Sequence, residues 1–161
     1  MNKKIGMGFF GELDLYLFGE GRHYRLYEKM GAHPFTYRRQ AGIHFAVWAP
    51  HAEEVSVVGD FNGWNPGKTP MKRISGSGIC EAFVPGLKEG ELYKYAISTK
   101  SSSLLMKADP FAFYSEYRPG TASVTADISG FSWSDSAWME KRRNQDPVKA
   151  PIAVYEVHLG S

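Results

Sequence analysis

A tryptophan and a lysine near the middle of the chain have the chemistry of a sugar-binding site. Trp64 lies in the run V-G-D-F-N-G-W-N-P at residues 58–66, a Gly/Asn turn between two β-rich stretches. A flat indole ring stacks on the C–H face of a pyranose, and groups such as those of Asn62 and Lys94 hydrogen-bond its hydroxyls. The structural alternative is that Trp64 folds back to cap a β-sandwich and Lys94 is an ordinary solvated side chain. The residues alone leave both interpretations open.

Other reactive or charged residues give weaker signals. A loop at Tyr114, Tyr117 and Arg118 is suited to ligand binding, but interdomain packing is the simpler interpretation. A basic stretch permits a phosphate or nucleic-acid site, although a solvated face or interdomain ion pairs explain it better: Arg22, Arg25, Lys29, Arg38 and Arg39. His44 and His51 are too isolated to indicate a metal.

Motifs for catalysis are missing from the sequence. It contains no G-x-S-x-G, no P-loop and no dinucleotide fingerprint. Its carboxylates are scattered, and one sequence cannot identify a glycosidase pair among them. We therefore expect no catalytic residue, no metal and no cofactor in this chain.

Composition narrows the class of protein. The 161 residues carry a net charge of +2, with 43% hydrophobic and 22% charged residues, which is typical of a globular domain and argues against a nucleic-acid partner. A single cysteine, Cys80, excludes an internal disulfide framework. No apolar run approaches the roughly 18 residues of a membrane span, and glycines and acids break up any signal-peptide core after Met1. A reduced, cytoplasmic protein without a membrane partner is expected.

The site must be positioned by strands. Alternating or β-rich residues predict strands at 43–48, 54–58, 79–84, 92–98 and 124–128, separated by Gly, Asn and Pro turns. In the fourth of these, Tyr93 and Tyr95 share one face and Lys94 projects from the other. Roughly seven short strands in about 95 residues predict an all-β, immunoglobulin-like antiparallel β-sandwich, with an open barrel as the alternative.

The ends of the chain differ from this middle zone. Helical spacing predicts two short helices within residues 1–34, the second ending near Gly31. The sandwich is expected over 35–130 and a helix with a linker over 131–151. The run I-A-V-Y-E-V-H-L, in residues 152–161, is typical of a buried parallel strand, and without a following element it suggests that the chain is a fragment.

Several motifs together resemble the N-terminal region of bacterial 1,4-α-glucan (glycogen) branching enzymes. The resemblance extends from about residue 12 to the end of the chain. It is carried by D-L-Y-L-F at 14–18, G-R-H-Y-R-L-Y-E-K at 21–29, G-A-H-P at 31–34, F-A-V-W-A-P at 45–50, V-V-G-D-F-N-G-W at 57–64, Y-K-Y at 93–95, K-A-D-P at 107–110, R-P-G-T-A-S at 118–123 and Y-E-V-H-L-G-S at 155–161. Some of these motifs are shared by a wider group, the α-amylase-type enzymes with a family 48 carbohydrate-binding module. The motifs at 21–29 and 155–161 narrow the resemblance to branching enzymes.

The resemblance implies where catalysis and binding lie. In that family an Asp nucleophile and a Glu acid/base lie in a (β/α)₈ barrel after the module, so this chain alone is expected to be inactive. Residues 152–161 would be the first strand of that barrel, and the barrel would be a partner. Sugar contacts map to Trp64 and Lys94. Leu104 and Leu105 stand where a second Trp is usual, and Thr121 is retained beside Pro119 and Ser123.

The function expected from this resemblance is that of a non-catalytic module that binds or orients α-1,4-glucan, such as glycogen or a maltooligosaccharide. The candidate contacts are Trp64, Lys94, Asn62, Leu105 and Thr121. One alternative is a purely structural module that packs on the barrel. Another is a stand-alone glycogen sensor, against which the strand at 152–159 argues.

Overall fold

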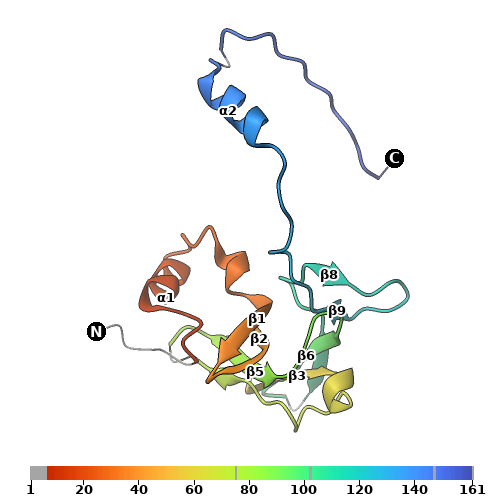
Figure 1. Cartoon of the computed structure of the whole chain (residues 1–161). Coiled ribbons are helices and arrows are strands. Elements are labelled where there is room, and N and C mark those ends of the chain that lie inside the picture. Colours follow the sequence, from red (N-terminus) through yellow and green to blue (C-terminus); the bar gives the residue numbers. More distant parts are fainter. Residues whose placement is uncertain (1–6, 75, 102, 147, 161) are drawn as a thin grey trace. The chain divides into compact units, whose positions relative to one another are not determined.

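Two short helices and nine strands are present in the computed structural model, which describes residues 7–74, 76–101, 103–146 and 148–160 (Figure 1). In chain order the elements are α1 (Glu12–Gly19), the 3₁₀ turn η1 (Leu26–Glu28), β1 (Gly31–Tyr37), β2 (Gln40–Trp48), β3 (Glu54–Gly59), the 3₁₀ turn η2 (Asp60–Asn62), β4 (Lys72–Arg73), β5 (Ile79–Pro85), β6 (Leu92–Ser98), β7 (Leu104–Lys107), β8 (Tyr114–Ser115), β9 (Ser123–Val124) and α2 (Ser136–Asn144). None of the described helices is long and apolar enough to cross a membrane.

The strands form two antiparallel sheets, which confirms the predicted all-β sandwich. One sheet has the order β1-β2-β5-β4 and the other β3-β6-β9-β8, with β7 also paired to β6. Buried residues from both sheets meet between them, among them Phe45 of β2, Val57 of β3 and Tyr93 of β6. The predicted alternation in β6 is confirmed, because Tyr93 and Tyr95 are fully buried whereas Lys94 is only partly so.

The outer face of β2 is also buried, which its alternating pattern did not predict. Ala46 on this face packs with Phe10 and Met30 of the N-terminal segment in a second apolar cluster. Beneath that segment, His44 Nε2 lies 2.8 Å from Glu81 Oε2, with both side chains at most 1% exposed. This burial lowers the pKa of His44, although the neighbouring Glu81 carboxylate opposes the shift.

The N-terminal segment is partly helical. The first expected helix is confirmed as α1, whereas the second is wrong: only the three-residue turn η1 forms, and β1 begins at Gly31. Gly31, which was expected to end the helix, is instead the first residue of β1, and Gly31–Tyr37 pair with β2. Pro34 is tolerated within β1 because this strand is at the edge of its sheet. The N-terminal segment and the sandwich thus form one compact unit, and residues 1–6 of the expected segment lie outside the described residues.

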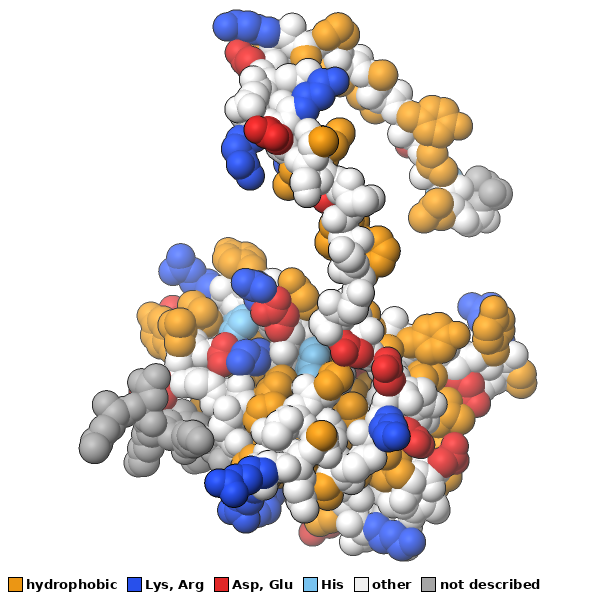
Figure 2. Space-filling view, viewed as in Figure 1, with side chains coloured by type: hydrophobic (Ala, Val, Ile, Leu, Met, Phe, Trp, Pro, Cys, Tyr) orange, Lys and Arg blue, Asp and Glu red, His pale blue; other side chains and the backbone are white. Residues whose placement is uncertain are grey.

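Residues 129–161 form a separate compact unit. The helix expected here is confirmed as α2, with Asp135 at its N-cap and three basic residues in its last turn. The described residues 152–160 form no strand, contrary to the expectation, and their apolar side chains are exposed (orange in Figure 2). A strand needs a hydrogen-bonded neighbour, and no described segment supplies one. Ser161 lies outside the described residues, and assignment of 152–161 to a barrel stays a prediction.

Candidate functional site

Trp64 is held in a defined orientation by the turn that follows β3. Its backbone N–H donates to the Gly59 carbonyl at 2.9 Å, and its indole Nε1 donates to Asp60 Oδ1 at 2.7 Å. The side chain is partly exposed. Trp64 also has a positive φ of 57°, a backbone conformation that costs a non-glycine residue on the order of 1–2 kcal/mol. A partly exposed tryptophan in a strained backbone conformation is a candidate for ligand contact.

The Asn62 side chain holds this turn through three hydrogen bonds. Its Oδ1 accepts from the Gly59 N–H at 3.1 Å, and its Nδ2 donates to the Val57 carbonyl at 3.0 Å and to Thr69 Oγ1 at 2.9 Å. Only 6% of the residue is exposed. Both amide hydrogens are therefore engaged within the protein, where they hold the turn that carries Trp64.

Lys94 and Thr121 come together as expected. Lys94 Nζ donates to Thr121 Oγ1 at 2.6 Å, which joins β6 to the loop before β9. An ammonium group has three N–H bonds, so two remain for ligand hydroxyls. Val58 of β3 pairs directly with Lys94. β3 ends at the next residue, Gly59, and the turn that carries Trp64 begins there. The turn and Lys94 therefore belong to neighbouring strands at the same end of the sheet.

The strand register separates Leu105 from Lys94. Leu105 pairs with Ile97, and Met106 pairs with Ala96. Because directly paired residues share a face and faces alternate along a strand, Met106 lies on the face of Lys94, and Leu105 lies on the opposite one. We call the side of this sheet that carries Val58, Lys94, Ala96 and Met106 the Lys94 face. Met106, 41% exposed, is thus the β7 residue of this face nearest to Lys94 in the register, and the sequence reasoning missed it.

A buried polar cluster fixes β6 beneath this face. The hydroxyls of Tyr93 and Tyr95 lie 2.6 and 3.1 Å from Asp109 Oδ2, and the Asp109 N–H donates to Ser123 Oγ of β9 at 2.8 Å. Burial raises the pKa of both tyrosines, so both hydroxyls keep their protons and donate. Burial also raises the pKa of Asp109, against the effect of these hydrogen bonds. Asp109, in the K-A-D-P motif at 107–110, therefore links β6 to β9 through hydrogen bonds.

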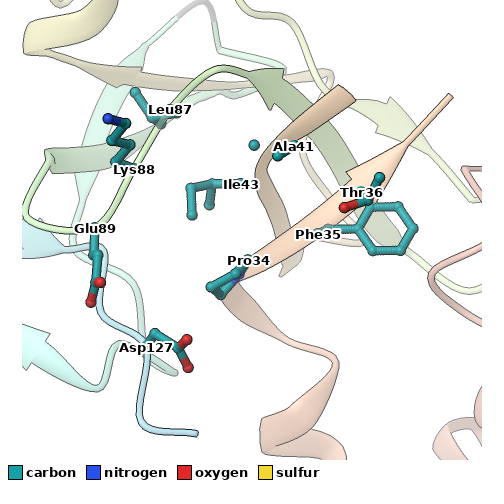
Figure 3. Close-up of a pocket in the computed structure, with 10 residues that line it drawn as sticks. Pro34, Phe35, Thr36, Ala41, Ile43, Leu87, Lys88, Glu89 and Asp127 are labelled. Atoms are coloured by element: carbon teal, nitrogen blue, oxygen red, sulfur yellow. The ribbon is translucent and has the colours of Figure 1, made fainter. Parts of the chain in front are cut away.

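A separate hollow lies beside β1 and β2, next to the loop between β5 and β6 (Figure 3). Its volume is about 500 Å³, and it is lined by Pro34, Phe35, Thr36, Ala41, Gly42, Ile43, Leu87, Lys88, Glu89 and Asp127. The Phe35 ring points away from it and packs with the rings of Phe9, His44 and Phe83 on the other side of the sheet. The one aromatic residue of this lining thus offers no stacking surface, and the hollow includes none of the predicted site residues. The Trp64 turn is the stronger candidate for sugar binding.

The two-sheet antiparallel scaffold defines the chain as a β-sandwich domain. Residues 29–112 match the model of carbohydrate-binding module 48 (isoamylase N-terminal domain). The chain belongs to this family.

The curated relatives of this chain are named as branching enzymes and are much longer. The chain is 52% identical over 151 residues to 1,4-alpha-glucan branching enzyme GlgB of Synechococcus sp. (strain JA-2-3B'a(2-13)), covering 94% of this chain and 20% of the relative. It is 50% identical over 161 residues to the enzyme of the same name from Butyrivibrio fibrisolvens, covering 100% of this chain and 25% of the relative. The chain thus spans a fifth to a quarter of the length of these relatives.

A solved structure of low sequence identity supports the fold. The crystal structure of a putative alpha amylase from Salmonella typhimurium superposes with a TM-score of 0.50 at 19% identity. The superposition covers 68% of this chain and 16% of that one. At this identity the likeness concerns the fold alone.

Proposed function

We propose that this chain is the N-terminal, non-catalytic part of a 1,4-α-glucan branching enzyme and that it binds α-1,4-glucan on the Lys94 face. The observation that carries the binding proposal is the Trp64 ring, fixed by Asp60 in a costly backbone conformation at the end of the strand beside Lys94. The 52% identity to a relative named as this enzyme supports the assignment to the larger protein. In that protein a catalytic barrel would follow the module and would be its partner. The barrel would form the glycosidic bond of each branch.

Binding is expected to be weak and to depend on Trp64. One ring and one ammonium group leave little free energy after the cost of association, so we expect a Kd of roughly 0.1–10 mM for maltoheptaose. Trp64→Ala removes the stacking surface and should weaken binding by about 1–2 kcal/mol. An NMR titration measures both values, with Trp138→Ala as the control, because Trp138 is a 58% exposed tryptophan of the other unit. A wild-type chain that shows no shifts with maltoheptaose would favour a purely structural module.

The register provides a gain-of-function test. Met106→Trp adds an aromatic ring to β7 on the Lys94 face and should tighten maltoheptaose binding by about 0.5–1.5 kcal/mol. Leu105→Trp adds the same ring to the neighbouring residue on the opposite face and should leave the Kd within about twofold. Both positions are partly exposed, at 41% and 40%, so the two variants test the face rather than the added bulk. Equal tightening by both, measured by isothermal titration, would contradict this placement of the site.

A further inference from the structure

The Lys94 face continues past β6 to the opposite edge of the sheet. Leu92 of β6 pairs with Val124 of β9, and Val124 pairs with Tyr114 of β8. Leu92 lies two residues from Lys94 and therefore on the same face. Tyr114, which is 54% exposed, consequently shares the face of Lys94 at the β8 edge.

The spacing of these side chains suits an extended ligand. Neighbouring strands lie about 4.8 Å apart, so β8 is about 10 Å from β6 and about 14 Å from β3, the strand that leads into the Trp64 turn. Lys94 thus lies between Tyr114 on β8 and the Trp64 turn that follows β3. This span is longer than a single sugar ring and matches a short oligosaccharide lying across the strands.

The hairpin that carries Tyr114 is fixed relative to Lys94. Lys94 Nζ binds Thr121 in the β8–β9 connection, and the Glu116 carboxylate accepts from the Ala122 N–H at 3.0 Å in the same connection. Beside the Tyr114 ring lies a hollow of about 450 Å³ that is lined by residues 114–118, including Arg118. Guanidinium and phenol groups there can hydrogen-bond sugar hydroxyls. The β8–β9 connection is thus held to β6 before a ligand binds.

We propose that Tyr114 is a second aromatic platform of the glucan site, so that the site holds a maltooligosaccharide across β3, β6, β9 and β8. This inference rests on the proposed function, because it extends the same site. It assigns the second ring to β8, whereas the family resemblance places a second Trp at the position of Leu104 and Leu105 in β7.

The test compares a short and a long ligand on the 161-residue chain. Tyr114→Ala should weaken maltoheptaose binding about three- to tenfold and leave maltotriose binding to the Trp64 end within about twofold. Tyr114→Phe keeps the ring and should bind maltoheptaose like the wild type. Tyr24→Ala serves as the control, because Tyr24 is an 88% exposed tyrosine in the N-terminal segment. Melting temperatures near the wild-type value establish that each variant is folded.

Two outcomes would overturn the inference in distinguishable ways. If Trp64→Ala weakens maltoheptaose binding and Tyr114→Ala does not, the second platform is wrong and the proposed function stands. If the wild-type chain binds neither maltotriose nor maltoheptaose, the proposed function fails and this inference fails with it.

Discussion

Glu81→Ala is expected to lower the free energy of unfolding by about 2–5 kcal/mol, because it leaves two donors beneath the N-terminal segment without an acceptor, at about 1–3 kcal/mol each. A carboxylate can only accept, so His44 Nε2 carries the hydrogen that it donates to Glu81 Oε2. The Met7 N–H donates to the other oxygen, Oε1, at 2.7 Å. Removing the carboxylate leaves both donors without an acceptor beneath the N-terminal segment, where the Phe9 ring stacks on His44 with centroids 4.2 Å apart.

Urea denaturation with two matched variants measures this effect. Glu81→Gln keeps an oxygen for the Met7 N–H and lets His44 accept from the amide after a change of tautomer, so it should cost less than half as much as the alanine variant. Glu54→Ala removes an exposed carboxylate of β3 and should change stability by no more than about 0.5 kcal/mol. A loss below about 1 kcal/mol for Glu81→Ala would mean that the pair does not anchor the segment.

The same pair predicts how stability depends on pH. Because the pKa of His44 is lower in the folded protein than its ordinary value near 6.5, the unfolded chain binds more protons in the range just below 6.5. Stability should therefore fall as the pH falls through that range towards the folded-state pKa. The imidazole Nδ1, a buried atom without a hydrogen-bond partner among the described residues, has no acceptor for the added proton.

Gly59→Ala is the second large effect, with an expected loss of about 3 kcal/mol or more. Gly59 is extended, so its backbone is unstrained, but an added β-carbon would lie less than 3.0 Å from the Leu92 carbonyl oxygen and from the Phe61 ring. Gly59 pairs with Tyr93, and its carbonyl accepts from the Trp64 N–H. The clash therefore has to open the β3–β6 ladder or displace the turn, and maltoheptaose binding should be lost with the stability.

Gly63→Ala is the control that separates a clash from backbone strain. Gly63 has a φ of +66° and no atom within 4 Å of an added β-carbon. Alanine there should cost only about 1–2 kcal/mol and leave the ladder intact. Hydrogen exchange of the β3 and β6 amides distinguishes the two variants: protection should be lost in Gly59→Ala and kept in Gly63→Ala. Equal protection in both would contradict the close approach at Gly59.

Local sequence by itself determined the central strands and the candidate turn. In β6 the period of two placed Tyr93 and Tyr95 inside and Lys94 outside, and the Gly/Asn run at 58–66 placed Trp64 in a turn. These features depend on side-chain alternation and turn chemistry within a few residues, which a single sequence displays directly. Three of the strands that the sequence reasoning missed lack such signals: β4 and β8 are two residues long, and all of β7 is exposed.

Only the tertiary structure decided which residues share a surface. Pairing with β6 assigned Met106 to the Lys94 face and Leu105 to the other, and pairing through β9 brought Tyr114 to that face from 20 residues away in sequence. A shift of one residue in register would exchange these faces. Likewise, Asn62 became a support for the turn only because Val57 and Thr69 lie beside it. Register and hydrogen-bond partners depend on the packing of distant strands, which no local pattern specifies.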